Sequence, residues 1–263
     1  MKTVLITGGS SGIGFEMSKC FAKAAYQILW VALSEKELQS ARTDLLKIYP
    51  EVVIKTLALD LSKTDSAEKV YHWVRYNNWR IDVLINNAGF ATFGFANELL
   101  LEREIDMIQL NVLSVFKLTR LFLKDMLMEN AGTIINISSN TSFQPVPKMA
   151  AYAATKSFVK QYSQSLMEEL KVLDSNVRVM TVCPAAIKNT AFKQEAGMEN
   201  IRTFKGLAAT TKEEVARDIW RGFTKGKNFV ATGVKLRFLL WLQPLLPASL
   251  VQFLLRIEMS EKK

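Results

Sequence analysis

The sequence predicts an α/β fold: a single domain in which a doubly wound, mostly parallel sheet lies between two layers of helices. Short apolar runs typical of strands alternate with amphipathic segments typical of helices from residue 2 to residue 182. Strands that alternate with helices at this pace form parallel sheets through right-handed crossovers. The 263 residues are 49% hydrophobic, which is enough for one large core, and no linker or repeat divides the chain.

The first half of the chain is expected to contain four strands and three helices. The strands are short apolar runs at residues 2–7, 27–33, 52–59 and 81–85. The helices are expected at residues 13–24, 35–49 and 64–78. The second helix carries one apolar stripe, formed by Leu38, Ala41, Leu45 and Ile48.

The second half continues the alternation with longer helices. Helical segments are expected at residues 98–129, 148–173 and 211–225, the last capped by Thr210 or Thr211. Strands are expected at residues 132–137, 176–182 and 228–231. Residues 185–207 are expected to mix loop and short helix.

The C-terminal tail has an unusual composition. Residues 238–255 carry no charge and are flanked by Arg237 and Arg256. A membrane-spanning helix needs about 20 apolar residues, and Pro244 and Pro247 would break a single straight helix. We therefore expect two short helices packed on the domain or at a subunit interface. A lid over an apolar substrate and a peripheral membrane contact through residues 236–257 are the alternatives.

Charge and composition argue against a nucleic-acid-binding, metal-binding or secreted protein. The net charge is +9, but the Lys and Arg residues are scattered without an aromatic-basic strip, which favours an anionic ligand over nucleic acid. Cys20 and Cys183 are typical of small apolar fillers in a reducing compartment, and no His/Cys cluster indicates a metal. The N-terminus does not have the pattern of a signal peptide, so we expect a cytoplasmic protein with an optional peripheral membrane contact.

A glycine-rich turn joins the first strand to the first helix. Glycines let the backbone approach a phosphate, and the start of the helix offers free N–H groups and a positive dipole end. Its candidate phosphate-binding residues are Gly8, Ser10, Ser11, Gly12, Ile13 and Gly14. Ligands of parallel sheets bind at the carboxyl ends of strands. Residues at the ends of the third and fourth strands are therefore further candidates: Asp60, Leu61, Asn87, Ala88 and Gly89.

The segment from residue 134 to residue 159 contains the reactive side chains. Ser138 and Ser139 end an apolar strand, and Tyr152 and Lys156 follow four residues apart on a predicted helix. Residues four apart lie on one face of a helix, so a hydroxyl, a phenol and an ammonium can meet at one point. Taken alone, a tyrosine and lysine at this spacing are more often a buried tyrosine beside a solvated lysine.

Together these motifs resemble the short-chain dehydrogenase/reductase family over roughly residues 1–232. Thr7–Gly14 is similar to its TGxxxGxG turn, Asp60 to the aspartate after its third strand, and Asn86–Gly89 to its NNAG turn. The catalytic tetrad of the family is matched by Asn111, Ser139, Tyr152 and Lys156. The resemblance implies a Rossmann-type domain at residues 1–232, with residues 233–263 as an apolar helical extension packed on it. It also implies hydride transfer between a nicotinamide and a carbonyl or alcohol.

The resemblance assigns a role to each member of the tetrad. Tyr152 is the expected general acid in reduction and base in oxidation, and Lys156 and the oxidised nicotinamide are expected to lower its pKa from about 10. Ser139 would orient the substrate oxygen; the thirteen-residue gap to Tyr152 selects it over Ser138. Lys156 would also hold the cofactor ribose. Asn111 would kink its helix and position a water that relays protons to Lys156.

The cofactor preference depends on the end of the second strand. No aspartate is present there to select NAD, whereas Ser10, Ser11 and Ser34 could hydrogen-bond a 2′-phosphate and Lys36 could add charge. Glu35 would favour NAD instead if its side chain turned inward toward the cofactor. We expect NADP, with NAD as the alternative. Pro184 and Ile187 are further cofactor-binding candidates, although the proline-glycine pair frequent in the family is proline-alanine here.

The expected substrate pocket is apolar and closed by residues 185–210 and the tail. Its candidate lining residues are Phe90, Phe93, Phe95, Phe143, Val146, Met149, Phe192 and Phe204. Such a lining predicts a steroid-like, long-chain acyl or aromatic carbonyl substrate. The competing interpretation is a non-catalytic dinucleotide-binding or membrane-associated scaffold. Helices near residues 103–129 and 152–173 resemble the pair through which the family forms homodimers and homotetramers.

Overall fold

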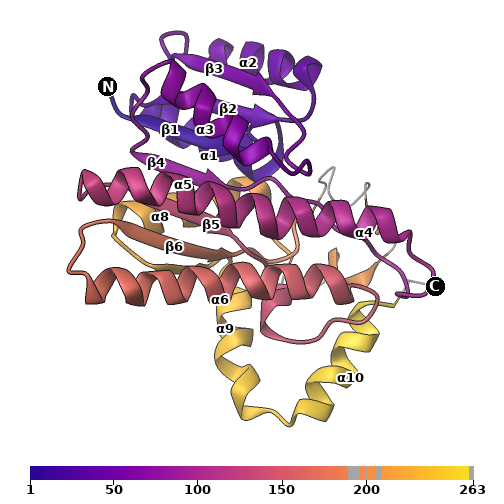
Figure 1. Cartoon of the computed structure of the whole chain (residues 1–263). Coiled ribbons are helices and arrows are strands. Elements are labelled where there is room, and N and C mark those ends of the chain that lie inside the picture. The colour runs from indigo at the N-terminus through magenta and orange to yellow at the C-terminus, as the bar shows by residue number, and fades with distance from the viewer. Residues whose placement is uncertain (189–195, 199–200, 205–208, 261–263) are drawn as a thin grey trace.

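A seven-stranded sheet, parallel throughout, forms the middle layer of the protein (Figure 1). The computed structural model describes residues 1–188, 196–198, 201–204 and 209–260, without the side chains of Phe204 and Pro244. The strand order is β3-β2-β1-β4-β5-β6-β7. The strands are β1 (Thr3–Thr7), β2 (Gln27–Ala32), β3 (Ile54–Ala58), β4 (Val83–Asn86), β5 (Thr133–Ile137), β6 (Arg178–Cys183) and β7 (Phe229–Ala231). The predicted α/β class is confirmed.

Helices cover both faces of the sheet and bury one apolar cluster on each. One face packs against α1 (Gly12–Lys23), α2 (Glu35–Ile48) and α8 (Lys212–Thr224). The other packs against α3 (Ser66–Tyr76), α5 (Val115–Met128) and α6 (Ala150–Val172). Figure 1 shows α5 and α6 lying side by side across the strands. Because both faces are covered, central strands such as β1 and β2 are buried along their whole length.

The helical region predicted at residues 98–129 is three elements instead of one helix. It consists of α4 (Leu101–Ile108), a π-helical turn η1 (Gln109–Ser114) and α5. Asn111 lies in the π-helical turn and is fully buried. π-Helical turns widen a helix locally and distort its axis. The distortion therefore occurs at the residue for which the family resemblance implies a kink.

The starts of two later helices follow local backbone chemistry. Helix α6 begins at Ala150, two residues later than expected, because Lys148 has a positive φ of 61° that a right-handed helix cannot contain. Helix α8 begins after Thr211, whose side chain accepts from the Glu214 N–H while Glu214 bonds back to the Thr211 N–H. This reciprocal capping box confirms the expected start of α8.

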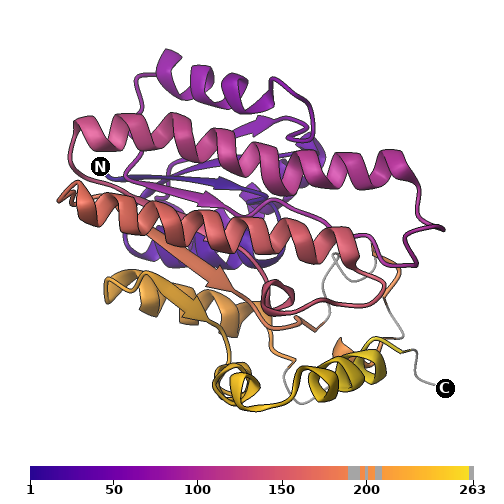
Figure 2. The ribbon, with the colours of Figure 1, turned by 60° about the horizontal axis from the view of Figure 1, so that its bottom comes forward.

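The tail forms two short helices that project from one end of the molecule (Figures 1 and 2). They are α9 (Val234–Leu242) and α10 (Ala248–Glu258), joined through a 3-10 turn η4 (Gln243–Leu245). Pro244 lies in this turn and Pro247 directly precedes α10, where neither has to supply a helical N–H. Among the helices that the structure describes, none has the length and apolar character to cross a membrane.

Candidate active site

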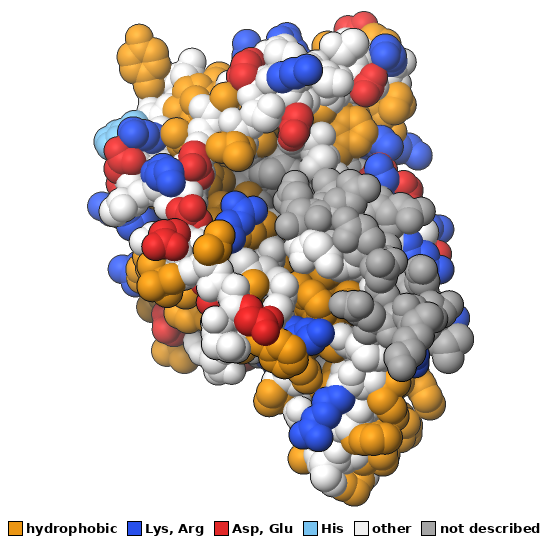
Figure 3. All heavy atoms as spheres, turned by 90° about the vertical axis from the view of Figure 1, so that its right-hand side faces the viewer, with side chains coloured by type: hydrophobic (Ala, Val, Ile, Leu, Met, Phe, Trp, Pro, Cys, Tyr) orange, Lys and Arg blue, Asp and Glu red, His pale blue; other side chains and the backbone are white. Residues whose placement is uncertain are grey.

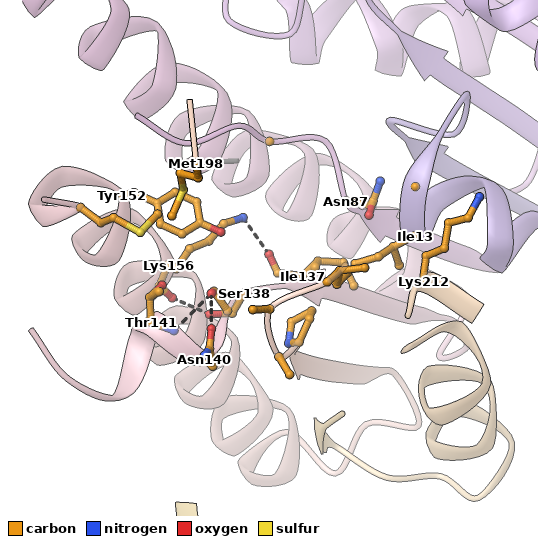
Figure 4. A pocket seen from close by; sticks show the side chains of 18 of the residues that line it. Ile13, Asn87, Ile137, Ser138, Asn140, Thr141, Tyr152, Lys156, Met198 and Lys212 are labelled. Atoms are coloured by element: carbon orange, nitrogen blue, oxygen red, sulfur yellow. Dashed lines mark hydrogen bonds between the residues drawn. The ribbon is translucent and has the colours of Figure 1, made fainter. Parts of the chain in front are cut away.

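A cavity of about 450 Å³ opens at the carboxyl edge of the sheet (Figure 4). It lies where the strand order reverses between β1 and β4, the usual ligand position in open parallel sheets. Many residues predicted from the sequence line it: Gly8, Ser11, Gly12, Ile13, Asn87, Ala88, Gly89, Ser139, Tyr152, Lys156, Pro184 and Ile187. Residues from four different strand ends thus meet at one point.

The glycine turn is held by the segment that follows β4. The Asn87 side chain donates to the carbonyls of Thr7 and Gly8 at 2.9 and 3.1 Å, and Thr7 Oγ1 accepts from the Asn87 and Ala88 N–H groups. A Cβ on Gly14 would lie 2.2 Å from the Gly8 carbonyl oxygen, so only glycine permits this approach of α1 to the turn. Gly14 therefore shapes the turn without lining the cavity.

Ser138 and Ser139 are separated by their hydrogen bonds. The Ser138 hydroxyl is buried and donates to the Lys156 carbonyl at 2.7 Å, which ties β5 to α6. Ser139 Oγ donates to the Asn140 side-chain oxygen at 3.1 Å and accepts from the Thr141 N–H at 3.2 Å. Its hydroxyl also lies close enough to the Tyr152 phenol to lower the pKa of that group. Ser139 is thus the serine beside the phenol, in agreement with the choice made from spacing.

Burial sets the pKa values of the tyrosine and the lysine. Desolvation raises the pKa of Tyr152 to about 12, and the hydrogen bond with Ser139 opposes this rise. Desolvation also lowers the pKa of Lys156 to about 8; its ammonium donates to the Ile137 carbonyl at 3.1 Å. In the protein without cofactor, burial therefore keeps the pKa of Tyr152 above its ordinary value, and its lowering by Lys156 and the oxidised nicotinamide stays a prediction. Tyr152 therefore holds its proton at neutral pH.

Asn111 lies behind the cavity instead of lining it. Its amide nitrogen donates to the Phe90 carbonyl at 2.9 Å and to Thr155 Oγ1 at 3.2 Å, and its oxygen accepts from the Phe90 N–H at 3.3 Å. A Cβ on Gly89 would lie 2.7 Å from the Asn111 oxygen and 3.4 Å from the Lys156 ammonium. Asn111 thus fixes the backbone at Gly89 and Phe90, which separates its side chain from Lys156. Its role in a water relay stays a prediction.

Four residues predicted to bind the cofactor lie at the same sheet edge but do not line this cavity: Ser10, Ser34, Asp60 and Leu61. Ser34 caps α2 by accepting from the Glu37 N–H at 3.2 Å. Asp60 accepts from the backbone and hydroxyl of Ser62, and Leu61 is buried in the core. Ser10 is half-buried in the glycine turn. Contact of these residues with a cofactor stays a prediction.

The apolar lining of the cavity differs from the one expected. Of the aromatic and aliphatic candidates with described side chains, Met149 alone lines the cavity, while Phe90 and Val146 are buried in the cluster around Tyr152. Phe93, Phe95 and Phe143 do not line it, and their rings lie within 4.0–5.5 Å of Lys148 or Lys160. Phe192 and the Phe204 side chain lie outside the described residues. The segments expected to close the pocket, residues 185–210 and the tail, contribute Ala185, Ala186, Met198, Thr203 and Met259 to the lining. Residues that sequence reasoning missed are Ile137, Asn140, Thr141 and Lys212.

The charged groups of the cavity are cationic. Lys156 and Lys212 line it, and no carboxylate belongs to the part of its lining that the structure describes. Lys212 is the first residue of α8 and lies 3.1 Å from the buried carboxylate of Glu16, which also bonds Lys19 at 2.9 Å. With the free N–H groups at the start of α1, this arrangement fits an anionic dinucleotide. The one sequence signal for Lys212 was the capping motif before α8, which predicts that the helix begins at this residue.

Comparisons with known proteins are consistent with this geometry. A family model described as short chain dehydrogenase matches residues 2–200. Very-long-chain 3-oxoacyl-CoA reductase of Bos taurus is 34% identical over 185 residues, which is 68% of this chain and 57% of that protein. The chain therefore spans little more than half the length of this relative.

Two solved structures resemble the whole fold. A short-chain dehydrogenase from Sphingobium yanoikuyae in complex with NADPH has a TM-score of 0.80 and 30% identity, over 88% of this chain and 87% of the other. A bulky-bulky ketone specific alcohol dehydrogenase from Comamonas testosteroni has a TM-score of 0.75 and 27% identity, over 88% and 86%.

Proposed function

The chain belongs to the short-chain dehydrogenase family, and on this premise we propose that it is an NADP(H)-dependent oxidoreductase acting on the carbonyl or alcohol of an apolar substrate. One observation carries the proposal: the Ser139 hydroxyl and the Tyr152 phenol lie close together in one cavity with Lys156 and the glycine turn. A proton donor thus lies beside a site suited to a dinucleotide. The NADPH bound by the Sphingobium yanoikuyae relative supports NADP, with NAD as the alternative.

The residues that would hold the cofactor form one side of the cavity. The turn around Gly8, Gly12 and Ile13 and the start of α1 would bind the pyrophosphate, where N–H groups and the positive helix end attract anions. Lys212 adds a positive charge beside Ile13 (Figure 4). Lys156 would bond the ribose. The nicotinamide, when bound, supplies or accepts the hydride.

Tyr152 would move the proton that accompanies hydride transfer. When a carbonyl is reduced, negative charge develops on its oxygen, and the protonated phenol of Tyr152 can donate to it. Ser139 would hold the same oxygen and so orient the carbonyl. Lys156 carries positive charge below its pKa of about 8 and would stabilise the phenolate that remains. In alcohol oxidation the phenolate would act as the base.

The apolar part of the cavity supports an apolar substrate. Met149, Met198 and Met259 line it, and all three belong to the same buried cluster as Tyr152. Methionine is flexible and adapts to ligands of different shape. The ketone and 3-oxoacyl substrates in the names of the relatives support a ketone with a long or bulky apolar group.

The test is NADPH oxidation by the purified protein with a panel of apolar ketones. Tyr152→Phe should lower kcat/KM by about 10³-fold, because general acid catalysis contributes 10²–10⁴. NADPH binding should persist in this variant. Tyr162→Phe is the matched control: it lies on the same helix, and its buried hydroxyl has no partner among the described residues. It should keep full activity.

Two results would contradict the proposal. One is tight NADPH binding by the wild type without turnover of any ketone or alcohol, which would favour the alternative of a dinucleotide-binding scaffold. The other is full activity of Tyr152→Phe. The scaffold alternative has less support, because it gives no reason for the Ser139 hydroxyl to lie beside the Tyr152 phenol in the cavity.

We also propose a homodimer or homotetramer formed through α4, α5 and α6. Large apolar side chains are exposed on these helices: Leu101, Ile105, Ile108, Phe116 and Phe158. Light scattering should give a mass of two or four chains, and a monomer would contradict the proposal. A cytoplasmic location stays a prediction.

A further inference from the structure

The projecting helices α9 and α10, with the η4 turn between them, expose apolar side chains over most of their surface. Helix α10 has no buried residue, and α9 buries Leu236 alone. Figure 3 shows hydrophobic side chains gathered at the end of the molecule that these helices form. Nine large side chains here are between 40% and 72% exposed: Val234, Phe238, Leu239, Trp241, Leu245, Leu250, Phe253, Leu254 and Ile257. A continuous apolar surface of this kind is typical of an interaction site.

The two helices contact the rest of the domain at their bases, and Gln243 of the η4 turn also donates to the Phe143 carbonyl at 3.5 Å. Leu236 packs with Ala185 and Ala231, next to the segment that follows β6. At the other base, α10 contacts the 3-10 turn η3 (Arg202–Phe204), and Met259 is buried in the cavity lining. The bases are thus fixed to the domain, whereas the outer apolar surface remains exposed.

Most charges on this segment are positive. Lys235, Arg237 and Arg256 are all exposed, and Glu258, the last residue of α10, is the one acidic residue of α9, η4 and α10. None of the three forms an ion pair with another described residue. Trp241 is 68% exposed, and its indole combines an apolar ring with one N–H donor. Apolar side chains with basic residues beside them and an indole at the surface match the chemistry of an anionic bilayer interface.

We propose that α9, η4 and α10 dock on the surface of an anionic lipid bilayer. The helices have 9 and 11 residues, so they would lie in the interface without crossing it. A second copy of the chain fits less well, because a symmetric interface places the same patch on both sides and would bring the cations of each copy together. Bilayer headgroups carry the complementary charge.

Docking in this way would place the cavity beside the membrane. Met259 follows the last turn of α10 and lines the cavity, and Thr203 of η3 lines it as well. An apolar substrate dissolved in the bilayer would then have a short path to Tyr152. This part of the inference rests on the proposed function, whereas the docking itself does not.

Vesicle co-sedimentation of the full-length protein tests the docking. The wild type should bind vesicles of phosphatidylcholine with phosphatidylglycerol more tightly than vesicles of phosphatidylcholine alone. The double variant Trp241→Ser/Phe253→Ser should bind at least about 10-fold more weakly, because two large apolar groups no longer enter the interface. The control Tyr76→Ser/Met128→Ser removes two exposed apolar side chains from other helices and should bind like the wild type.

A charge variant separates the electrostatic contribution. Lys235→Glu/Arg237→Glu should abolish the preference for anionic vesicles while leaving the fold intact, since both side chains are exposed. Wild type that stays in the supernatant with both vesicle types would overturn the proposal, and so would unchanged binding of Trp241→Ser/Phe253→Ser. Loss of self-association in that variant, without vesicle binding by the wild type, would assign the surface to a second copy instead.

Sedimentation does not depend on turnover, so its result is independent of the proposed chemistry. If the docking fails while ketone reduction persists, the enzyme proposal stands. If vesicle binding is seen without turnover of any substrate, the docking stands and the oxidoreductase proposal fails.

Discussion

The carboxyl edge of the sheet buries polar side chains, whereas the α9–α10 projection exposes apolar ones. At the edge, polar groups such as Asn111, Ser138 and Lys156 are at most 5% exposed, and each has hydrogen-bond partners. In the projection, Phe238 and Trp241 are apolar and exposed. Buried polar groups stabilise a fold only when they are paired, and exposed apolar groups contribute little until something covers them. These three polar side chains of the first region are therefore paired within the chain, whereas the apolar side chains of the second are left exposed.

At the carboxyl edge of the sheet, the largest stability effect is expected at Asn111. Asn111→Leu leaves the buried N–H and carbonyl of Phe90 without their side-chain partners. Each buried unpaired group costs about 1–3 kcal/mol, so the free energy of unfolding should fall by about 3 kcal/mol. Chemical denaturation measures the loss. Gln109→Leu, at a half-buried position of the same π-helical turn, should cost under about 1 kcal/mol, and equal losses would contradict this account.

A smaller effect is expected from the charge of Lys156. Its pKa of about 8 lies below its ordinary value of 10.5, so between these pH values the unfolded chain binds a proton that the folded protein does not. Stability should therefore rise with pH in this window, by about 2 kcal/mol from pH 8 to pH 10. Below pH 8 both states are protonated, and this contribution should be flat. Lys156→Met should lack the rise, and a parallel profile for the variant would rule out the buried charge as its cause.

The smallest effect on stability is expected for the exposed side chains of the α9–α10 projection. Phe238→Ala should change the free energy of unfolding by less than about 0.5 kcal/mol, because the ring is 59% exposed in the free protein. Leu236→Ala, two residues earlier on the same helix, removes a buried side chain and should cost about 2–4 kcal/mol. Thermal denaturation of the two variants makes the comparison. A large loss for Phe238→Ala would show that the ring is covered within the chain.

Local patterns were sufficient to predict the fold. Apolar runs placed the strands within about two residues of their observed ends, since strands buried on both faces need nearly continuous apolar sequence. Topology then follows from the alternation of strands and helices, which brings the strand ends that carry Gly8, Asn87 and Ser139 to one edge. The thirteen-residue gap selected Ser139 over Ser138, and the hydrogen bonds agree with that choice.

Long-range contacts were not accessible from these patterns. Lys212 and Met259 reach the cavity from distant parts of the chain, and Phe143 points elsewhere although its position in the sequence suggested a lining role. The burial that raises the pKa of Tyr152 in the protein without cofactor was not accessible either, because it depends on how completely the folded chain removes the phenol from water.

The sequence by itself determined which groups this protein can use: a glycine-rich turn, a serine, a tyrosine and a lysine at matched spacing, and a tail without charge over residues 238–255. Spacing along a strand or helix decides which face a side chain takes, so these features are local. The tertiary structure alone decided which of them are buried, which residues complete the cavity, and that α9 and α10 project from the domain while Met259, which follows them, lines the cavity. Burial depends on the sum of contacts from every element around a residue, and no local pattern contains that sum.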